Sequence, residues 1–325
     1  MSISKYHYHR LNGSEKCIYE QIREGVSVLS NNISLPLIPK DRLASIYESV
    51  LLDNPIFFYT ISYRLITDLN NRRVILSPIY RYSNEIIKQS ANALNKYLRL
   101  FDVVKHKSEV EKELFVHDFC LDNFTYDYSL NEHSFSPLGL LVYNTGVCAG
   151  ISKFVKIALD YLNVGCVLVS GKAINSVNQK TELHMWNIVS ISGNTYHLDV
   201  TFDMSQKTRV KRYDYFNLPD VEISKDHLIT TIVPKCITVG KDYYSANSLV
   251  FSNFKDLKKH IRKLLSKGKR HVVIKLSNES LRSSANIADR VLELALKQLQ
   301  SPFNQNVSVE VSFNLSQSVF ELTFK

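Results

Sequence analysis

A cysteine between two glycines, at the point where a loop becomes a helix, constrains this chain most. Residues 146–150 read Gly-Val-Cys-Ala-Gly, with Cys148 at their centre. A helix N-terminus favours an anion because its first N–H groups have no partner within the helix. Such a position stabilises a thiolate, the form in which cysteine is a nucleophile. The apolar residues that follow recur at helical spacing and predict a buried helix: Phe154, Ile157, Ala158, Tyr161 and Leu162.

Downstream, a predicted hairpin brings a histidine and an aspartate together. Residues 185–191 and 195–201 are strand-like runs around Ser-Gly-Asn at 192–194, a typical hairpin turn. His184 opens the first strand, and Asp199 returns on the second, a few positions from the point directly opposite His184. Because neighbouring strands lie about 4.8 Å apart, the carboxylate can reach the imidazole diagonally. The pattern predicts a triad in which Cys148 attacks, His184 transfers the proton and Asp199 orients the ring.

Three ordered motifs resemble the transglutaminase-like (transglutaminase/protease-like) superfamily. The likeness covers about residues 110–230 and is similar to bacterial members with a helical N-terminal extension. Phe202 stands where many members have tryptophan. The motifs are Gly146-Val147-Cys148-Ala149-Gly150, His184-Met185-Trp186-Asn187 and His197-Leu198-Asp199-Val200-Thr201-Phe202-Asp203.

The resemblance implies an α+β fold with a papain-like core, in which the helix bearing Cys148 packs on an antiparallel sheet bearing His184 and Asp199. It also implies a covalent thioester intermediate. The backbone N–H of Cys148 is the natural first oxyanion donor. Family members add a side chain upstream, and Tyr126 is the candidate here, with a core aromatic as the alternative. Trp186, the only tryptophan, is expected as a wall of the cleft or in the core.

The 325 residues suggest more than one domain. Residues 1–107 are expected to be mainly helical, with two strands near 57–66 and 74–82. Residues 108–235 would form the catalytic core, with an irregular stretch at 126–146. Residues 240–325 would form a small α+β module that has a basic helix, ends in a hairpin and does not complete the active site. Three polar residues of the core are expected to be structural: His117, His197 and Asp203.

The cysteines and the short motifs indicate no cofactor and no metal. Five widely spaced cysteines make a poor disulfide framework, and no Cys-x-x-Cys or His/Cys pair has zinc spacing. There is no Gly-rich phosphate loop, no His-Glu-x-x-His and no EF-hand loop. Without a dense acidic cluster, activation by calcium is not expected.

The net charge of +9 is concentrated in the predicted helix at residues 255–270. The charges either solvate one face of this helix or contact an anionic partner such as an acidic protein or a membrane surface. Nucleic acid is not expected, because no aromatic residues interleave for base stacking. One acidic residue, Asp256, accompanies eight basic ones: Lys255, Lys258, Lys259, Arg262, Lys263, Lys267, Lys269 and Arg270.

The polar N-terminus has no apolar signal segment, and no apolar run approaches the roughly 18 residues of a membrane span. We therefore expect a cytoplasmic protein, with specialised secretion left open. Its expected activity is acyl transfer from a protein or peptide amide. Hydrolysis is favoured, because an unregulated cross-linker would harm a cytoplasm, and amine transfer as in a transglutaminase is the alternative. From another class, an inactive binding module of the same fold remains open.

Overall fold

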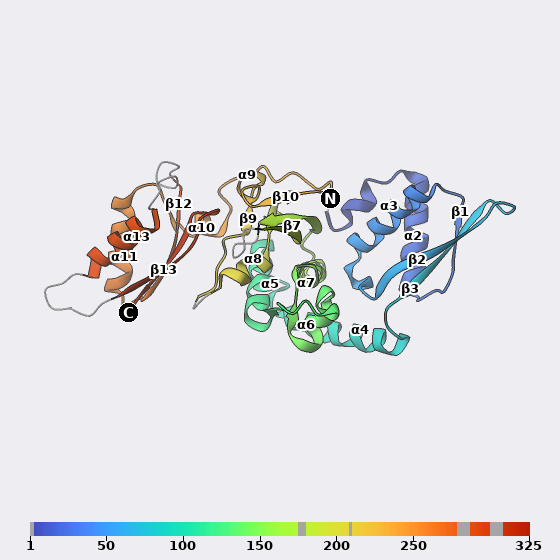
Figure 1. The fold of residues 1–325 in the computed structure, drawn as a ribbon, viewed down its shortest axis with the longest axis horizontal. Helices are drawn as coiled ribbons and strands as arrows, with labels where there is room; N and C mark the ends of the chain where they lie inside the picture. The colour runs from blue at the N-terminus through green and yellow to red at the C-terminus, as the bar shows by residue number, and fades with distance from the viewer. Residues whose placement is uncertain (1–2, 175–179, 208–209, 278–286, 300–307) are drawn as a thin grey trace.

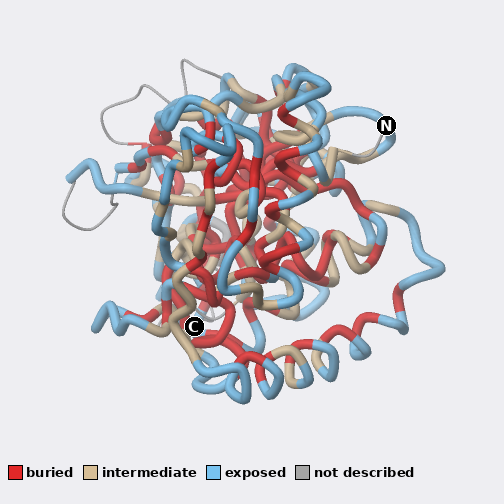
Figure 2. The backbone as a smooth tube through the Cα atoms, turned by 90° about the vertical axis from the view of Figure 1, so that its right-hand side faces the viewer, coloured by how far each residue is buried: buried red, intermediate tan, exposed pale blue. Residues whose placement is uncertain are grey.

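The computed structural model describes residues 3–174, 180–207, 210–277, 287–299 and 308–325. Three antiparallel or mixed sheets, each accompanied by helices, lie in a row along the molecule (Figure 1). Seen from one end of the row, buried positions gather in the interior and exposed ones lie mostly on the outside (Figure 2). The chain is therefore an α+β protein, as the sequence predicts.

The N-terminal part combines helices with a small sheet of strand order β1-β3-β2. The apolar stripe of α2 is buried, and Asn12 and Glu15 form a capping box at its start. Strands β2 and β3 confirm the two predicted strands, whereas the four-residue β1 was not predicted. The elements are η1 (Ile3–Lys5), α1 (Tyr6–His9), α2 (Gly13–Ser27), β1 (Ile33–Pro36), α3 (Lys40–Asp53), η2 (Pro55–Phe57), β2 (Thr60–Asp68) and β3 (Arg73–Tyr80).

The central part is a five-stranded antiparallel sheet, of order β10-β6-β7-β8-β9, covered by helices. Its helices are α4 (Asn84–Arg99), η3 (Leu100–Val104), α5 (Glu109–Asn123), η4 (Glu132–Phe135), α6 (Pro137–Tyr143), α7 (Cys148–Tyr161), α8 (Val200–Gln206) and α9 (Asp220–Ile223). Its strands are β4 (Thr125–Tyr126), β5 (Thr145–Gly146), β6 (Cys166–Ile174), β7 (Thr181–Ile191), β8 (Asn194–Leu198), β9 (Phe216–Leu218) and β10 (His227–Ile229).

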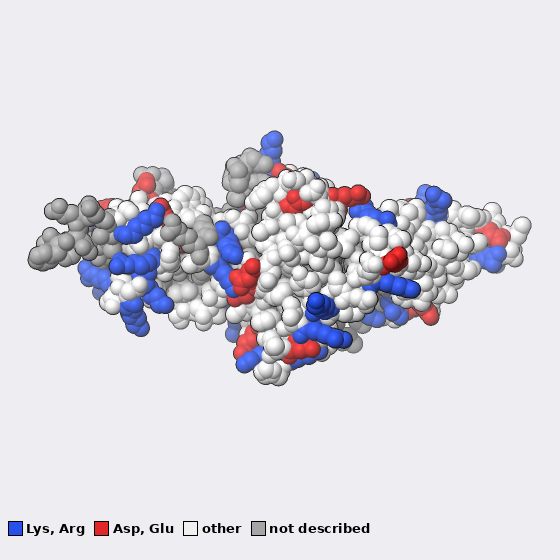
Figure 3. All heavy atoms as spheres, turned by 90° about the horizontal axis from the view of Figure 1, so that it is seen from below, with Lys and Arg blue, Asp and Glu red and all other residues white. Residues whose placement is uncertain are grey.

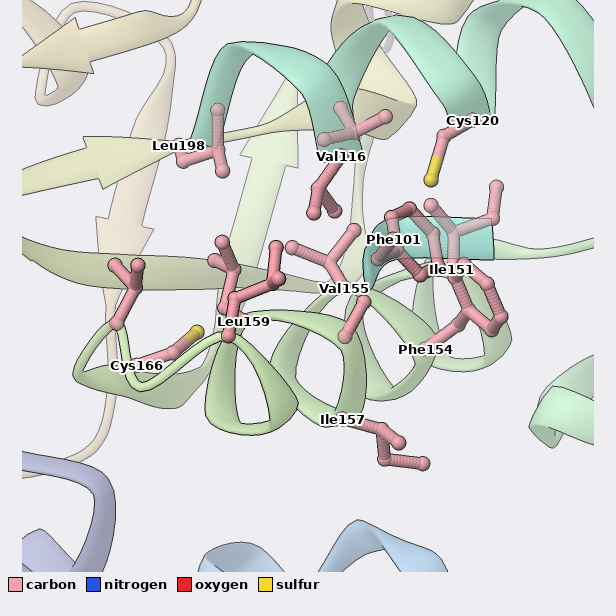
Figure 4. Close-up of a cluster of buried hydrophobic side chains, with 14 of the residues drawn as sticks. Phe101, Val116, Cys120, Ile151, Phe154, Val155, Ile157, Leu159, Cys166 and Leu198 are labelled. Carbon is pink, nitrogen blue, oxygen red and sulfur yellow. The ribbon is translucent and has the colours of Figure 1, made fainter. Parts of the chain in front are cut away.

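Helix α7 is the centre of the largest buried cluster. Its side chains Phe154, Val155 and Leu159 are completely buried. Figure 4 shows the apolar side chains of α7 in one cluster with Val116 and Cys120 of α5 and Leu198 of β8. This packing fixes the position of the helix that begins at Cys148.

Two local predictions for the central part were wrong. Helix α6 lies in a stretch expected to be irregular, and Pro137 occupies its first turn, where a missing N–H costs nothing. The second hairpin strand ends at Leu198 rather than continuing to Thr201. Asp199 instead caps α8, because its side chain accepts a hydrogen bond from the Phe202 N–H. Carboxylates are favoured at helix N-caps, and this preference overrides the strand-like sequence.

The C-terminal part has a four-stranded sheet of order β11-β12-β14-β13 with its own apolar cluster, and β13 and β14 form the predicted terminal hairpin. The division of the chain at residues 107, 235 and 240 stays a prediction. The elements are α10 (Tyr243–Ala246), β11 (Val250–Phe251), α11 (Phe254–Ser266), β12 (His271–Leu276), α13 (Ile287–Leu299), β13 (Val309–Asn314) and β14 (Val319–Phe324).

The predicted basic helix is α11, which buries Leu257 and Ile261 and leaves most of its lysines and arginines exposed. Figure 3 shows basic side chains gathered over the C-terminal part of the molecule. Contact of this face with an anionic partner stays a prediction. None of the helices in the described ranges combines the length and the apolar character needed to cross a bilayer.

Candidate active site

Cys148 is the first residue of α7 and is half-buried. The helix starts there because Val147 is extended, and because the short strands β4 and β5 hold residues 145–146 beside residues 125–126. Gly150 lies in the first turn, against backbone carbonyls of η4: a Cβ at this position would meet Ser134 O at 2.3 Å. The glycine of the Cys-Ala-Gly motif therefore permits a close backbone approach under the nucleophile.

Two buried side chains tie α7 to β7. The Ser152 hydroxyl lies 2.7 Å from the Cys148 carbonyl oxygen and 2.8 Å from the Met185 carbonyl oxygen. From the strand, the Asn187 amide donates to the Ser152 carbonyl oxygen at 3.0 Å. These bonds fix the helix turn that carries Cys148 relative to the strand that carries His184, so the distance between the two residues is built into the fold.

His184 lies between Cys148 and Asp199. Its Nε2 is 2.6 Å from Asp199 Oδ2, and because a carboxylate only accepts, Nε2 carries the proton. Nδ1 is then the ring nitrogen left for the Cys148 thiol, which lines the same cavity as His184. Burial would lower the pKa of His184, but the charge of Asp199 and hydrogen bonds with Asp199 and Cys148 raise it to about 10.

Asp199 is almost completely buried, and each of its oxygens has a partner. Oδ1 accepts from the Phe202 N–H at 3.0 Å, which is the N-cap bond of α8. Oδ2 accepts from His184 and lies 3.0 Å from Nε2 of His227. Burial would raise the pKa of Asp199, but the charges and hydrogen bonds of His184 and His227 hold it well below its usual range. The carboxylate is therefore ionised throughout the neutral range.

Aromatic rings hold the imidazole of His184 from two sides. Trp186 stacks on it with ring centroids 5.9 Å apart, and Phe202 meets it edge-on at 4.8 Å. Trp186 is completely buried and does not line the cavity. It therefore belongs to the core and is not a wall of the cleft. Gly171 makes room for the indole, since a Cβ there would lie 2.7 Å from the ring and 2.3 Å from a backbone oxygen of Leu228.

Cys148 and His184 open into one cavity of about 240 Å³. Tyr126 lines it, as the sequence suggests for a residue near the nucleophile. Burial and the nearby Cys148 raise the pKa of Tyr126 to about 12, so its hydroxyl keeps its proton. The other lining residues are mainly apolar: Tyr128, Leu130, Ala173, Glu182, Leu183, Thr201, Phe202 and Ser205.

The polar residues expected to be structural lie outside the cavity lining. His117 is buried between Asp118 and Asp203, at 3.2 and 3.0 Å. His197 accepts from the Trp186 N–H and lies 2.9 Å from Asp220. Sequence reasoning missed His227, which has no motif around it and reaches Asp199 only because β10 pairs with β6.

Within the described ranges, two groups of side chains have ligand atoms close enough together for a metal ion to be considered. The first group contains His184, Asp199 and His227. Its two imidazoles lie 2.6 and 3.0 Å from the same carboxylate oxygen, distances that fit N–H···O hydrogen bonds. In the second, His197 already uses both ring nitrogens, while Asp220 and Cys236 complete the group. Hydrogen bonds thus occupy the ring nitrogens that face the carboxylates in both clusters.

No protein-family model and no curated protein matches the chain. Three solved structures are similar to it in part. A protein described as "a TGase" is 15% identical over 47% of each chain, with a TM-score of 0.31. A "putative cysteine protease" from Cytophaga hutchinsonii is 15% identical over 43% of this chain and 62% of its own, with a TM-score of 0.29. A "putative protease" from Parabacteroides distasonis is 9% identical over 81% of this chain and 61% of its own, with a TM-score of 0.28.

The similarity covers 47–62% of the length of these proteins, which is less than two thirds in each case. The names belong to those proteins. What this chain can do has to follow from its own residues.

Proposed function

We propose that this protein is a cysteine-nucleophile acyl-transfer enzyme that acts on protein or peptide amides through a thioester on Cys148. One observation carries the proposal: His184 hydrogen-bonds Asp199 through Nε2 and shares one cavity with Cys148, so its other ring nitrogen is left for the thiol. A buried carboxylate that orients a histidine next to a nucleophile is the arrangement that covalent catalysis requires.

In the first half-reaction, His184 holds the proton of the Cys148 thiol as the imidazolium, and the Cys148 thiolate attacks the amide carbonyl carbon, whose oxygen becomes an oxyanion. The backbone N–H of Cys148 and the protonated Tyr126 hydroxyl are the proposed donors to this oxygen. The C–N bond then breaks, and the His184 imidazolium gives its proton to the leaving amine. In the second half-reaction, His184 takes a proton from the acceptor, which attacks the thioester, and the sulfur leaves as thiolate.

Features of the cavity support a peptide substrate. Large apolar side chains beside the thiol are exposed: Tyr128 is 82% and Leu183 is 83% exposed. Exposed apolar groups around a pocket suit a partner that covers them on binding.

The acceptor is proposed to be water, which makes the enzyme a peptidase or deamidase. Amine transfer as in a transglutaminase shares the same thioester, and His184 can deprotonate either acceptor.

The test is intact-mass analysis of the full chain incubated with glutamine-containing and other peptides, with Cys148→Ala as the control. A mass increase equal to the acyl group, absent from Cys148→Ala, is expected. Adding a primary amine then separates the acceptors: free acid as the product supports hydrolysis, and amine adduct supports transfer. Binding without adduct or product from any peptide would contradict the proposal and favour the inactive binding module.

A further inference from the structure

A second imidazole lies on the other side of the triad carboxylate. His227 opens β10 and is 4% exposed. Its Nε2 is 3.0 Å from Asp199 Oδ2, the same oxygen that His184 reaches at 2.6 Å. Its Nδ1 is 2.6 Å from Oδ1 of Asp226. Asp199 is therefore held between two histidines, and His227 between two carboxylates.

This geometry determines the charge of His227. A carboxylate only accepts hydrogen bonds, so both ring nitrogens of His227 have to donate, and only the imidazolium can do so. Burial would lower the pKa of His227, but its hydrogen bonds with Asp199 and Asp226 raise it. A buried positive charge thus lies against Asp199, opposite His184.

His227 is itself braced from behind. The Tyr215 hydroxyl donates to Oδ2 of Asp226 at 2.6 Å. Asn314, from the hairpin of the C-terminal part, donates to the Tyr215 oxygen at 3.1 Å and to Asp214 at 3.1 Å. All of these side chains are buried. A continuous hydrogen-bonded chain therefore runs from the C-terminal part to Asp199.

We propose that His227 is a positioning residue of the active site, which, braced by Asp226, holds the Asp199 carboxylate in the orientation that receives the His184 N–H. The inference rests on the proposed function, because it assigns His227 a task only if His184 serves the thiol. Two bonds to one oxygen and the N-cap bond to the other leave the carboxylate no free rotation. Removal of a side chain that holds a reacting group in place through hydrogen bonds typically changes activity by about 10- to 100-fold.

Charged and titratable groups face Asp199 and His227 from several elements, and any pH effect has to be read against all of them. They are Cys148 of α7, His184 of β7, His197 of β8, Tyr126 of β4, and Tyr215 and Asp226 in the segments before β9 and β10.

The test is His227→Gln in the full chain, which removes the charge and one of the two donors. The hydrogen bond and charge of His227 lower the pKa of Asp199, so their loss raises it. We expect the acid limb of Cys148 alkylation by iodoacetamide to move to higher pH and the rate at pH 6 to fall by about 10- to 100-fold. Asp226→Asn, which leaves His227 with one ionised partner, should give a smaller change in the same direction and cover the case in which His227→Gln does not fold.

His117→Gln is the matched control. That imidazole is also completely buried between two carboxylates, Asp118 and Asp203, but bonds neither Asp199 nor His184. It should lose stability in urea while the alkylation profile stays that of the wild type. A merely structural role for His227 predicts the same behaviour for both histidine variants.

An unchanged alkylation profile in a folded His227→Gln or Asp226→Asn variant would overturn the inference. Failure of the proposed function looks different: wild-type Cys148 would then be no more reactive than the exposed Cys17. If the proposed function fails, the role of His227 can still be tested by following the titration of Asp199 through the His184 imidazole NMR resonances. It should move to higher pH in His227→Gln, and an unmoved titration would refute it.

Discussion

Replacing Gly150 by alanine tests whether the first turn of α7 positions the nucleophile. A Cβ at residue 150 would lie 2.3 Å from Ser134 O and 3.0 Å from Ser136 O, both backbone atoms. Carbon–oxygen contacts normally begin near 3.3 Å, so the turn has to move by about 1 Å. Overpacking of this kind costs about 1–3 kcal/mol. A displacement of about 1 Å at reacting groups costs roughly 100-fold in rate.

The assay pairs urea denaturation with the rate of Cys148 alkylation at neutral pH. Gly150→Ala should lose both stability and thiol reactivity. Gly13→Ala is the control, because Gly13 is also helical and a Cβ there meets nothing within 4 Å. It should be neutral or stabilising by up to about 1 kcal/mol, with normal reactivity. A Gly150→Ala variant with the alkylation rate of the wild type would refute the reasoning.

Three further predictions concern charge and the cavity rim. Glu113 is completely buried, and burial raises its pKa from 4.5 to about 8, so folding stability should fall as pH rises between these values. Glu113→Gln should remove this fall, which is roughly 4–5 kcal/mol at most. The test is urea denaturation of the wild type and of Glu113→Gln at pH 5 and 9, and an equal loss of stability in both proteins would contradict the prediction. Turnover needs the His184 imidazolium, so kcat/KM should decline as pH rises through about 10, and a decline near 6.5 would show an isolated histidine instead. Tyr128→Ser and Leu183→Ser should lower kcat/KM for peptides with apolar residues beside the reacting amide, with stability within about 0.5 kcal/mol, whereas Leu228→Ser, exposed outside the cavity, should not.

The sequence predicted the parts of the site that depend on local patterns. The apolar stripe after Cys148 belongs to α7, and the turn at 192–193 closes the β7–β8 hairpin. In the observed register Asn187 pairs with Leu198, so Asp199 lies two positions from the point opposite His184, which is the diagonal approach expected.

Features that depend on distant pairing could not be predicted. His227 meets Asp199 because β10 joins the sheet beside β6, and no local pattern specifies that neighbour. The burial of Glu321 is similar: alternation places it on the polar side of β14, but that side packs against the central part, where Arg212 lies 3.6 Å away. The charged face of a strand is exposed only if nothing covers it.

The C-terminal part was expected not to complete the active site. Among the described residues, no hydrogen bond joins a residue after 240 to Cys148 or His184, yet Asn314 reaches the network behind Asp199 through Tyr215. The C-terminal part therefore supports the site indirectly, through hydrogen bonds to residues behind Asp199. The sequence signal for this was absent, because a single asparagine next to a hairpin turn is ordinary.

The most direct test of the account is limited alkylation of the full chain with iodoacetamide at neutral pH, followed by peptide mapping. Cys120, Cys166 and Cys236 are buried, so the comparison is between Cys148 and the exposed Cys17. We predict that Cys148 is labelled first although it is less exposed, and that His184→Ala removes this preference. Labelling of Cys17 at an equal or higher rate, with no effect of His184→Ala, would contradict a nucleophile at Cys148.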